Sequence, residues 1–328
     1  MAHCVTHERK NNRRAFLAAL SCGAGAALAS GAAAAQDVIK VDVDLVNVLF
    51  SVRDKNNAYV NTLTKDDFEV REDTKLQEIR TFTRETDLPL TLGLLVDVSM
   101  SQSRLIEDER RAASLFFQEV LRPKDMAFLM SFGTEAELLQ DSTNSVKTLQ
   151  RALGELRLSG GGPVGTIINP GPIPQQVRGT VLFDAVFLGA KEKLQGEVGR
   201  KALILITDGV DHGSRVKMTE AIQTAIRADA LIYSVLYVDP AYQMFGGSGE
   251  GDMRKMAEET GGRMFRVDRR NNLEAIFRQI SEEMRSQYAI SYSSTNPARD
   301  GAFRRLDIRA KNKDLKVQAR KGYFAPRG

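Results

Sequence analysis

Short apolar runs alternate with amphipathic stretches through the middle of the chain, from about residue 90 to about residue 285. The runs have the length of buried strands, and the stretches between them repeat apolar residues at helical spacing. This alternation predicts an α/β domain built on a doubly wound, mostly parallel sheet that helices cover on both faces. The predicted strands are 92–96, 126–132, 202–207, 231–237 and 263–267, with a short edge strand at 138–139, and the predicted helices are 104–121, 145–156, 180–194, 219–228, 252–259 and 273–285.

The two ends of the chain have a different, β-like pattern. Before the α/β region, strands are predicted at 41–50, where the apolar alternation slips by one residue at Val46, and at 68–73 and 77–82. After it, strands are predicted at 288–292, 304–310 and 315–319. We expect the two ends to pair as one small β-sandwich with the α/β domain inserted between its strands; two separate appendages are the alternative. The expected organisation is an N-terminal β segment at 36–88, an α/β domain at 89–286 and a C-terminal β segment at 287–328.

The first 35 residues have the pattern of an export signal peptide and are excluded from the fold prediction. A basic segment precedes an alanine-rich apolar stretch at 15–29 and a small-residue cleavage site at 33–35. Arg13-Arg14 and the residues after them resemble a twin-arginine signal, although Asn12 stands where Ser or Thr is usual; an ordinary secretory signal is the alternative. Either signal predicts an exported mature protein, periplasmic or extracellular.

Cleavage of this leader changes the composition of the mature protein. The full chain has 46 basic and 42 acidic side chains; the leader holds four of the basic and one of the acidic ones, so the net charge falls from +4 to +1. A near-neutral chain does not favour nucleic acid as a partner. Both cysteines are lost, which excludes disulfides and zinc–thiolate sites, and His212 alone cannot make a multi-histidine site.

Neither a membrane span nor a lipid anchor is expected in the mature chain. The apolar stretch of the leader is short and alanine-rich, whereas a span needs about 20 strongly apolar residues. Cys22 lies three residues after Ala19, where a lipoprotein signal has Leu, so lipid attachment at Cys22 is not expected.

Two long loops follow predicted strands. The segment 159–179 contains a Gly triplet and four prolines, and the segment 245–251 is dominated by glycine. Both are expected at the carboxyl ends of the strands, where functional loops of α/β proteins concentrate. Flexible decoration is an equally good explanation of their composition.

Oxygen-bearing side chains follow two of the predicted buried strands. Asp97, Ser99 and Ser101 stand at alternate positions after the first strand, so their oxygens can turn toward one point. Asp208 ends the strand at 202–207, and Gly209 permits a turn there. Oxygen ligands gathered at the carboxyl ends of parallel strands suit a hard divalent cation.

A simpler explanation exists for some of these residues. Ser101 or Ser103 can cap the helix that is predicted to begin near residue 104, and Thr180 can cap the helix at 180–194. Alternatively, Thr180 supplies a further hydroxyl to the same cation.

Taken together, these residues resemble the von Willebrand factor type A (VWA) domain and its metal-ion-dependent adhesion site, the MIDAS. The D-x-S-x-S loop, a later threonine and an aspartate at a further strand end appear in the family order. The resemblance implies a cation, Mg²⁺ with Mn²⁺ or Ca²⁺ as other candidates, that is held by Asp97, Ser99, Ser101, Thr180 and Asp208.

The resemblance extends over essentially the whole mature chain. Motifs outside the site are similar to a bacterial subgroup, the VWFA-related acidobacterial domain proteins; they stand at 65–68, 70–73, 77–79, 179–185, 208–214 and 322–325. One departure is the segment 159–179, which is longer and more proline-rich than the family pattern before the threonine.

The resemblance implies a protein-binding module and not an enzyme: the cation keeps a free position, which an Asp or Glu of a partner protein fills. A metal-dependent phosphohydrolase is a rival interpretation, because an Asp after the first strand can also be a phosphoryl acceptor. Such enzymes have a second carboxylate where this chain has Ser99, and an ordinary hydroxyl cannot protonate a leaving group. A metal-free structural protein of the cell envelope is the third interpretation.

Overall fold

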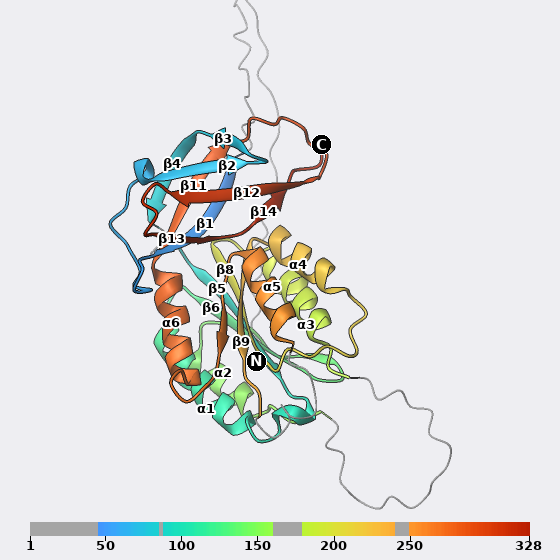
Figure 1. The fold of residues 1–328 in the computed structure, drawn as a ribbon. Coiled ribbons are helices and arrows are strands. Elements are labelled where there is room, and N and C mark those ends of the chain that lie inside the picture. Colours follow the sequence, from blue (N-terminus) through green and yellow to red (C-terminus); the bar gives the residue numbers. More distant parts are fainter. Residues whose placement is uncertain (1–44, 85–87, 160–178, 240–248) are drawn as a thin grey trace, which may run out of the picture. The chain divides into compact units, whose positions relative to one another are not determined.

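The computed structural model describes residues 45–84, 88–159, 179–239 and 249–328 (Figure 1). The predicted leader at 1–35 lies outside these residues, as do most of the loop at 159–179 and part of the one at 245–251. In the described part of the chain, no helix is both long enough and apolar enough to span a bilayer.

A six-stranded sheet forms the centre of the α/β region. Its strand order is β10-β9-β8-β5-β6-β7; neighbouring strands are parallel except at the edge, where β7 runs antiparallel to β6. Every residue of β5 and β8 is buried, as expected for central strands with helices on both faces. The strands are β5 (Leu90–Asp97), β6 (Met126–Phe132), β7 (Ala136–Thr143), β8 (Arg200–Thr207), β9 (Ala230–Leu236) and β10 (Met264–Arg266).

Helices cover both faces of this sheet (Figure 1). Phe116 of α1, Leu149 of α2 and Phe277 of α6 share one apolar core with the sheet. Leu182 of α3 and Met253 of α5 belong to the core on the opposite face, to which α4 also contributes. The helices are α1 (Ile106–Val120), α2 (Val146–Leu153), α3 (Leu182–Leu188), α4 (Met218–Arg227), α5 (Glu250–Thr260) and α6 (Leu273–Arg285), and a short π-helix (Gly189–Leu194) continues α3.

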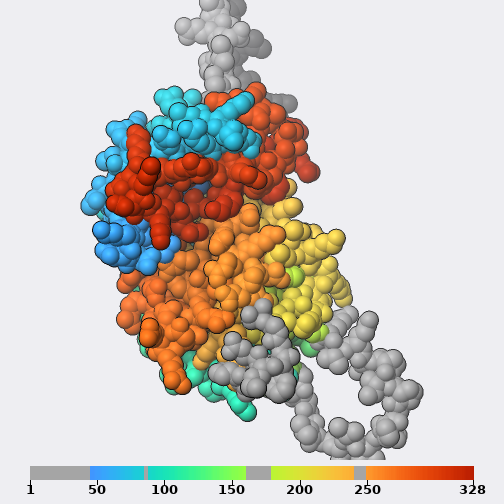
Figure 2. All heavy atoms as spheres, in the orientation of Figure 1, coloured from blue at the N-terminus to red at the C-terminus, as the bar shows by residue number. Residues whose placement is uncertain are grey.

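Strands from both ends of the chain build two further sheets, in the orders β13-β1-β11-β4 and β14-β12-β2-β3. Central strand β1 pairs with β11, and β2 pairs with β12, so neither end completes a sheet alone. Figure 2 shows the two ends, in blue to cyan and in red, packed side by side. The strands are β1 (Leu45–Arg53), β2 (Phe68–Glu72), β3 (Lys75–Gln77), β4 (Ile79–Arg84), β11 (Gln287–Ser293), β12 (Phe303–Ala310), β13 (Lys316–Ala319) and β14 (Gly322–Phe324).

The two antiparallel sheets enclose an aromatic core. Phe50, Phe68 and Tyr288 contact one another there, with the Phe50 and Phe68 rings 5.1 Å apart. Alternate residues of β1 point into this core, which explains the period-two pattern of its sequence. The structure therefore confirms the predicted fold class: a mostly parallel sheet between helices, plus a small β-sandwich made by the terminal segments.

Some element boundaries differ from the prediction. Helix α1 begins at Ile106, after a short 3₁₀ turn (Met100–Gln102), and α3 begins at Leu182. The last strand, β14, was not predicted; it is three residues long and too short for a periodic pattern.

Candidate metal centre

The proposed ligands that follow β5 lie close to Asp208, which follows β8, because β5 and β8 are adjacent strands. Val96 of β5 lies opposite Ile206 of β8 in a parallel pair, so Asp97 and Thr207 end their strands at the same edge of the sheet. The chain leaves β5 toward β6 on one side, while β8 lies on the other side. Such a reversal of strand order opens a crevice at the carboxyl ends of the strands, where α/β proteins bind ligands.

Hydrogen bonds join four of the five predicted ligands. The Ser101 hydroxyl donates to Asp208 Oδ2 at 2.6 Å, and the Ser99 and Ser101 hydroxyl oxygens are 2.9 Å apart. The Ser99 amide donates to Asp97 Oδ1 at 2.8 Å, which folds the loop back on the strand end. The structure thus brings Asp97, Ser99, Ser101 and Asp208 together, although they come from segments more than 100 residues apart.

Thr180 is held between the loops on either side of this group. Its carbonyl accepts hydrogen bonds from His212 N and Gly213 N, in the loop after β8. The next amide, of Val181, donates to Gly133 O, just after β6. No described hydrogen bond joins the Thr180 hydroxyl to the other four residues, so its part in the site remains a prediction.

The capping roles considered for the site residues are wrong. The residue before α1 is Leu105, and neither Ser101 nor Ser103 caps that helix. Similarly, Val181 precedes α3, so Thr180 stands one residue too early to cap it. The first turn of α3 instead receives Asp211, whose Oδ1 accepts a hydrogen bond from Phe183 N at 3.2 Å. The hydroxyls of Ser101 and Thr180 are therefore not used by helix ends.

Gly209 determines the backbone conformation of the loop after β8. Its φ is +82°, a backbone conformation that side chains disfavour, and an added Cβ would lie 2.6 Å from Met253 Sδ. Next to it, Gly249 N donates to Asp208 O, and Val210 N donates to Asp208 Oδ1 at 3.0 Å. These contacts keep Asp208 Oδ2 directed at Ser101.

Burial, with the nearby charge of Asp208 as a smaller cause, raises the pKa of Asp97 to about 6. Hydrogen bonds from Ser99 and Thr207 act in the opposite direction but are outweighed. Two acidic groups in a dry environment repel each other, and a cation relieves that repulsion.

Sequence reasoning missed two residues beside the site. Thr207 donates its hydroxyl to Asp97 Oδ2 at 2.5 Å and accepts a hydrogen bond from Gly209 N, so it orients both strand ends. Glu109 of α1 is fully buried, and neither of its carboxylate oxygens has a hydrogen-bond partner among the described residues. Burial first, and then the charge of Asp97, raise the pKa of Glu109 well above its usual range. Glu109 could have been found, since it interrupts the apolar face of Leu105, Ala112 and Phe116.

This donor set fits a hard divalent cation. It offers carboxylate and hydroxyl oxygens only, the ligands that Mg²⁺ and Ca²⁺ prefer. Within the described residues, no three His, Cys, Asp or Glu side chains form a metal-binding group, and a cation here would use hydroxyls as well as carboxylates. The raised pKa values of Asp97 and Glu109 show that negative charge is disfavoured at this loop when no cation is bound, and a positive ion there would relieve this effect.

Comparison with known proteins gave similarity only to solved structures: no family model and no curated protein matches the chain. The protein BatB from Bacteroides thetaiotaomicron is 20% identical, with 60% of this chain and 97% of that chain covered and a TM-score of 0.42. A von Willebrand factor type A protein from Catenulispora acidiphila is 14% identical, with 87% and 74% covered and a TM-score of 0.44.

A third similar structure is proximal thread matrix protein 1 from the mussel byssus, described with a zinc-occupied MIDAS motif. It is 12% identical, with 66% of this chain and 50% of that chain covered and a TM-score of 0.47. At such scores these similarities assign no function to the present chain. The resemblance to the VWA domain rests on the chain's own residues, above all the D-x-S-x-S loop at the end of β5.

Proposed function

We propose that this chain is an exported, metal-dependent protein-binding module of the adhesion type. Asp97, Ser99, Ser101, Thr180 and Asp208 hold a divalent cation, Mg²⁺ with Mn²⁺ or Ca²⁺ as other candidates. The carrying observation is the hydrogen-bonded series from Ser99 through Ser101 to Asp208, which joins the ends of two adjacent strands.

The cation would supply a positive anchor for an outside carboxylate. Two ligand carboxylates balance the charge of a divalent ion without exceeding it, and Mg²⁺ prefers six oxygens and keeps water readily. A partner's Asp or Glu can replace such water. The chain's own residues orient the ligands. The Thr207 hydroxyl donates a hydrogen bond to Asp97 Oδ2, and the turn at Gly209 keeps Asp208 directed at Ser101.

Calorimetric titration with Mg²⁺ and Mn²⁺ tests the metal site. We expect the wild type to bind, and Asp97→Ala and Ser101→Ala to weaken binding at least tenfold. Ser103→Ala is the matched control, because Ser103 lies in the same segment and its hydroxyl has no described hydrogen bond. Equal affinities in wild type and Asp97→Ala would leave the metal-free envelope protein as the better interpretation.

Partner binding needs a separate experiment. The mature protein, immobilised in Mg²⁺, should retain an envelope protein that EDTA releases and that Asp97→Ala fails to retain. Capture that does not depend on Mg²⁺ counts against an adhesion-type mechanism even if the metal binds.

We further propose that the site does no hydrolysis. Ser99 stands where a phosphohydrolase needs a second carboxylate as its acid–base group. A generic phosphate ester incubated with the Mg²⁺-loaded protein should show no turnover above buffer. Turnover that Asp97→Ala abolishes would favour the phosphohydrolase instead.

A further inference from the structure

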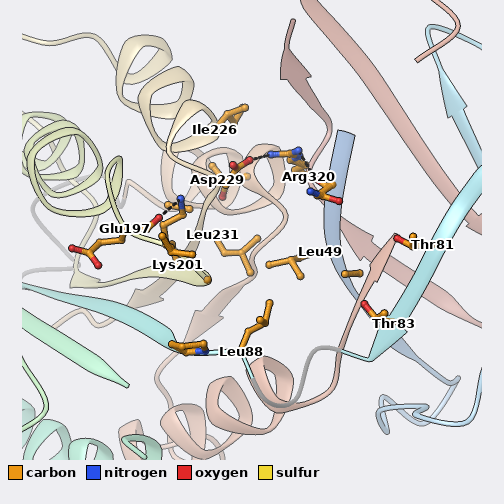
Figure 3. Close-up of a pocket in the computed structure, with 17 residues that line it drawn as sticks. Leu49, Thr81, Thr83, Leu88, Glu197, Lys201, Ile226, Asp229, Leu231 and Arg320 are labelled. Carbon is orange, nitrogen blue, oxygen red and sulfur yellow. Dashed lines mark hydrogen bonds and ion pairs between the residues drawn. The ribbon is translucent and has the colours of Figure 1, made fainter. Parts of the chain in front are cut away.

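A pocket lies at the opposite end of the central sheet from the proposed metal centre. It has a volume of about 560 Å³ and is lined by β-sandwich residues such as Leu49 and Thr83 and by α/β residues such as Lys201 and Leu231 (Figure 3). It opens near Pro89 and Gly199, just before β5 and β8, whereas Asp97 ends β5. At about 3.3 Å per strand residue, roughly 20 Å separate the two sites. A pocket of this size suits a small organic molecule.

Lys201 places a positive charge in this pocket. The residue is only 8% exposed, and its ammonium donates one described hydrogen bond, to Glu197 O at 3.1 Å. No carboxylate of the described residues forms an ion pair with it. Buried lysines are rare unless they are paired, because an ammonium loses its hydration there. Two of its three N–H donors therefore remain for a ligand or water.

The two acidic residues of the pocket do not neutralise Lys201. Asp229 pairs with the Arg320 guanidinium, which also donates to Asn47 O at 2.7 Å. The Glu197 carboxylate points away from the leucines of the pocket (Figure 3). Among the described residues that line the pocket, the charge that remains for a ligand is thus positive.

Apolar side chains form the rest of the wall. Leu49, Leu88 and Leu231 lie around the middle of the pocket (Figure 3). The backbone of Leu88 is bound to the α/β region, because Arg200 donates to Leu88 O at 2.9 Å. Ala289 lies between Leu49 and Thr83 in register across the sheet and leaves room between them. The middle of the pocket is therefore apolar, with space beside Ala289.

We propose that this pocket binds a small organic anion, one carboxylate on an aliphatic body. The carboxylate accepts hydrogen bonds from the Lys201 ammonium, and the aliphatic body lies among Leu49, Leu88 and Leu231. This proposal is independent of the metal centre, since no residue is shared between the two sites.

Octanoate is a suitable probe. 1-Octanol is the control that lacks the carboxylate charge, and acetate is the control that lacks the aliphatic chain. Calorimetry on the wild-type mature protein should show octanoate binding at least tenfold more tightly than either control. Lys201→Met keeps an unbranched apolar side chain but removes the ammonium, and should weaken octanoate binding at least tenfold. Lys255→Met, an exposed lysine on α5, should leave the affinity within twofold of wild type.

A cavity-filling variant distinguishes the loss of ligand binding from the loss of folding. Ala289→Leu should abolish octanoate binding while its circular dichroism stays that of the wild type. The proposal is overturned if octanoate fails to bind at millimolar concentration, if 1-octanol binds as tightly, or if folded Lys201→Met or Ala289→Leu binds octanoate like the wild type.

Discussion

Asp97 is a carboxylic acid at a buried strand end, and we propose it as a ligand of a cation. Burial raises its pKa from 3.8 to about 6, so without metal the folded state binds more protons than the unfolded state between these values. The free energy of unfolding must then fall as pH rises through that window. The loss of stability that comes from ionising the buried Asp97 is fully present above the folded pKa of about 6 and absent below the unfolded pKa of 3.8.

We therefore predict that, in EDTA, the wild type loses on the order of 2 kcal/mol of stability between pH 4 and 6.5 through this group. Urea titrations followed by circular dichroism at the two pH values measure the change. Asp97→Asn should show a clearly smaller loss, whereas Asp108→Asn, on the exposed side of α1, should keep the wild-type loss. Identical pH dependence in Asp97→Asn contradicts the assignment.

Gly209 allows a second test, since its φ of +82° and its close neighbours both exclude a side chain. Gly209→Ala should cost about 1–3 kcal/mol and weaken Mg²⁺ binding, because the turn that directs Asp208 must shift. Gly196→Ala is the matched control: nothing lies within 4 Å of its added Cβ, so stability should change by less than about 0.5 kcal/mol. Chemical denaturation of the wild type, Gly209→Ala and Gly196→Ala measures the free energy of unfolding of each.

Helix α1 carries an ionisable group on its apolar face. Glu109 is buried without a described hydrogen-bond partner, so its presence costs stability in the metal-free protein. Glu109→Met should raise the free energy of unfolding in EDTA by about 1 kcal/mol. Glu107→Met, with the side chain 76% exposed on the same helix, should have little effect. Destabilisation by Glu109→Met would mean that the carboxylate has a structural partner.

The boundaries of the helices depended on contacts that no periodic pattern shows. The start of α3 is set by Asp211, which comes 28 residues after Phe183 in sequence. The hydroxyls of Ser101 and Thr180 looked equally suitable as helix caps and as ligands. Only the position of the helix ends, at Leu105 and Val181, separated the two roles.

In the whole molecule, the terminal segments are joined by one buried carboxylate. Glu72 of β2 accepts hydrogen bonds from Tyr292 at 2.8 Å, from Tyr323 at 3.0 Å and from Ser294 at 2.6 Å, and it pairs with the buried Arg304. These partners lie more than 200 residues away in the sequence. The β-sandwich can therefore close only after the inserted α/β domain has been made.

Glu72→Ala should destabilise the protein by about 3–5 kcal/mol, because it leaves the Arg304 charge buried without its counter-ion. Thermal unfolding followed by circular dichroism measures the loss as a lower midpoint. Glu69→Ala, on the same strand with the side chain 46% exposed in its ion pair with Arg71, should change stability by less than about 1 kcal/mol. Similar midpoints for Glu72→Ala and the wild type would argue against this role of Glu72.

Hydrophobic periodicity was enough to predict the alternating elements and the parallel sheet, because strand and helix repeats are local properties of the chain. The meeting of Asp97, at the end of β5, with Asp208, just after β8, was also predictable, since the carboxyl ends of parallel strands lie at one edge. The role of Thr207, the pairing of Glu72 with the far end of the chain and the pocket around Lys201 were not predictable. Each depends on residues that only folding brings within a few ångströms, and no local pattern encodes such distances.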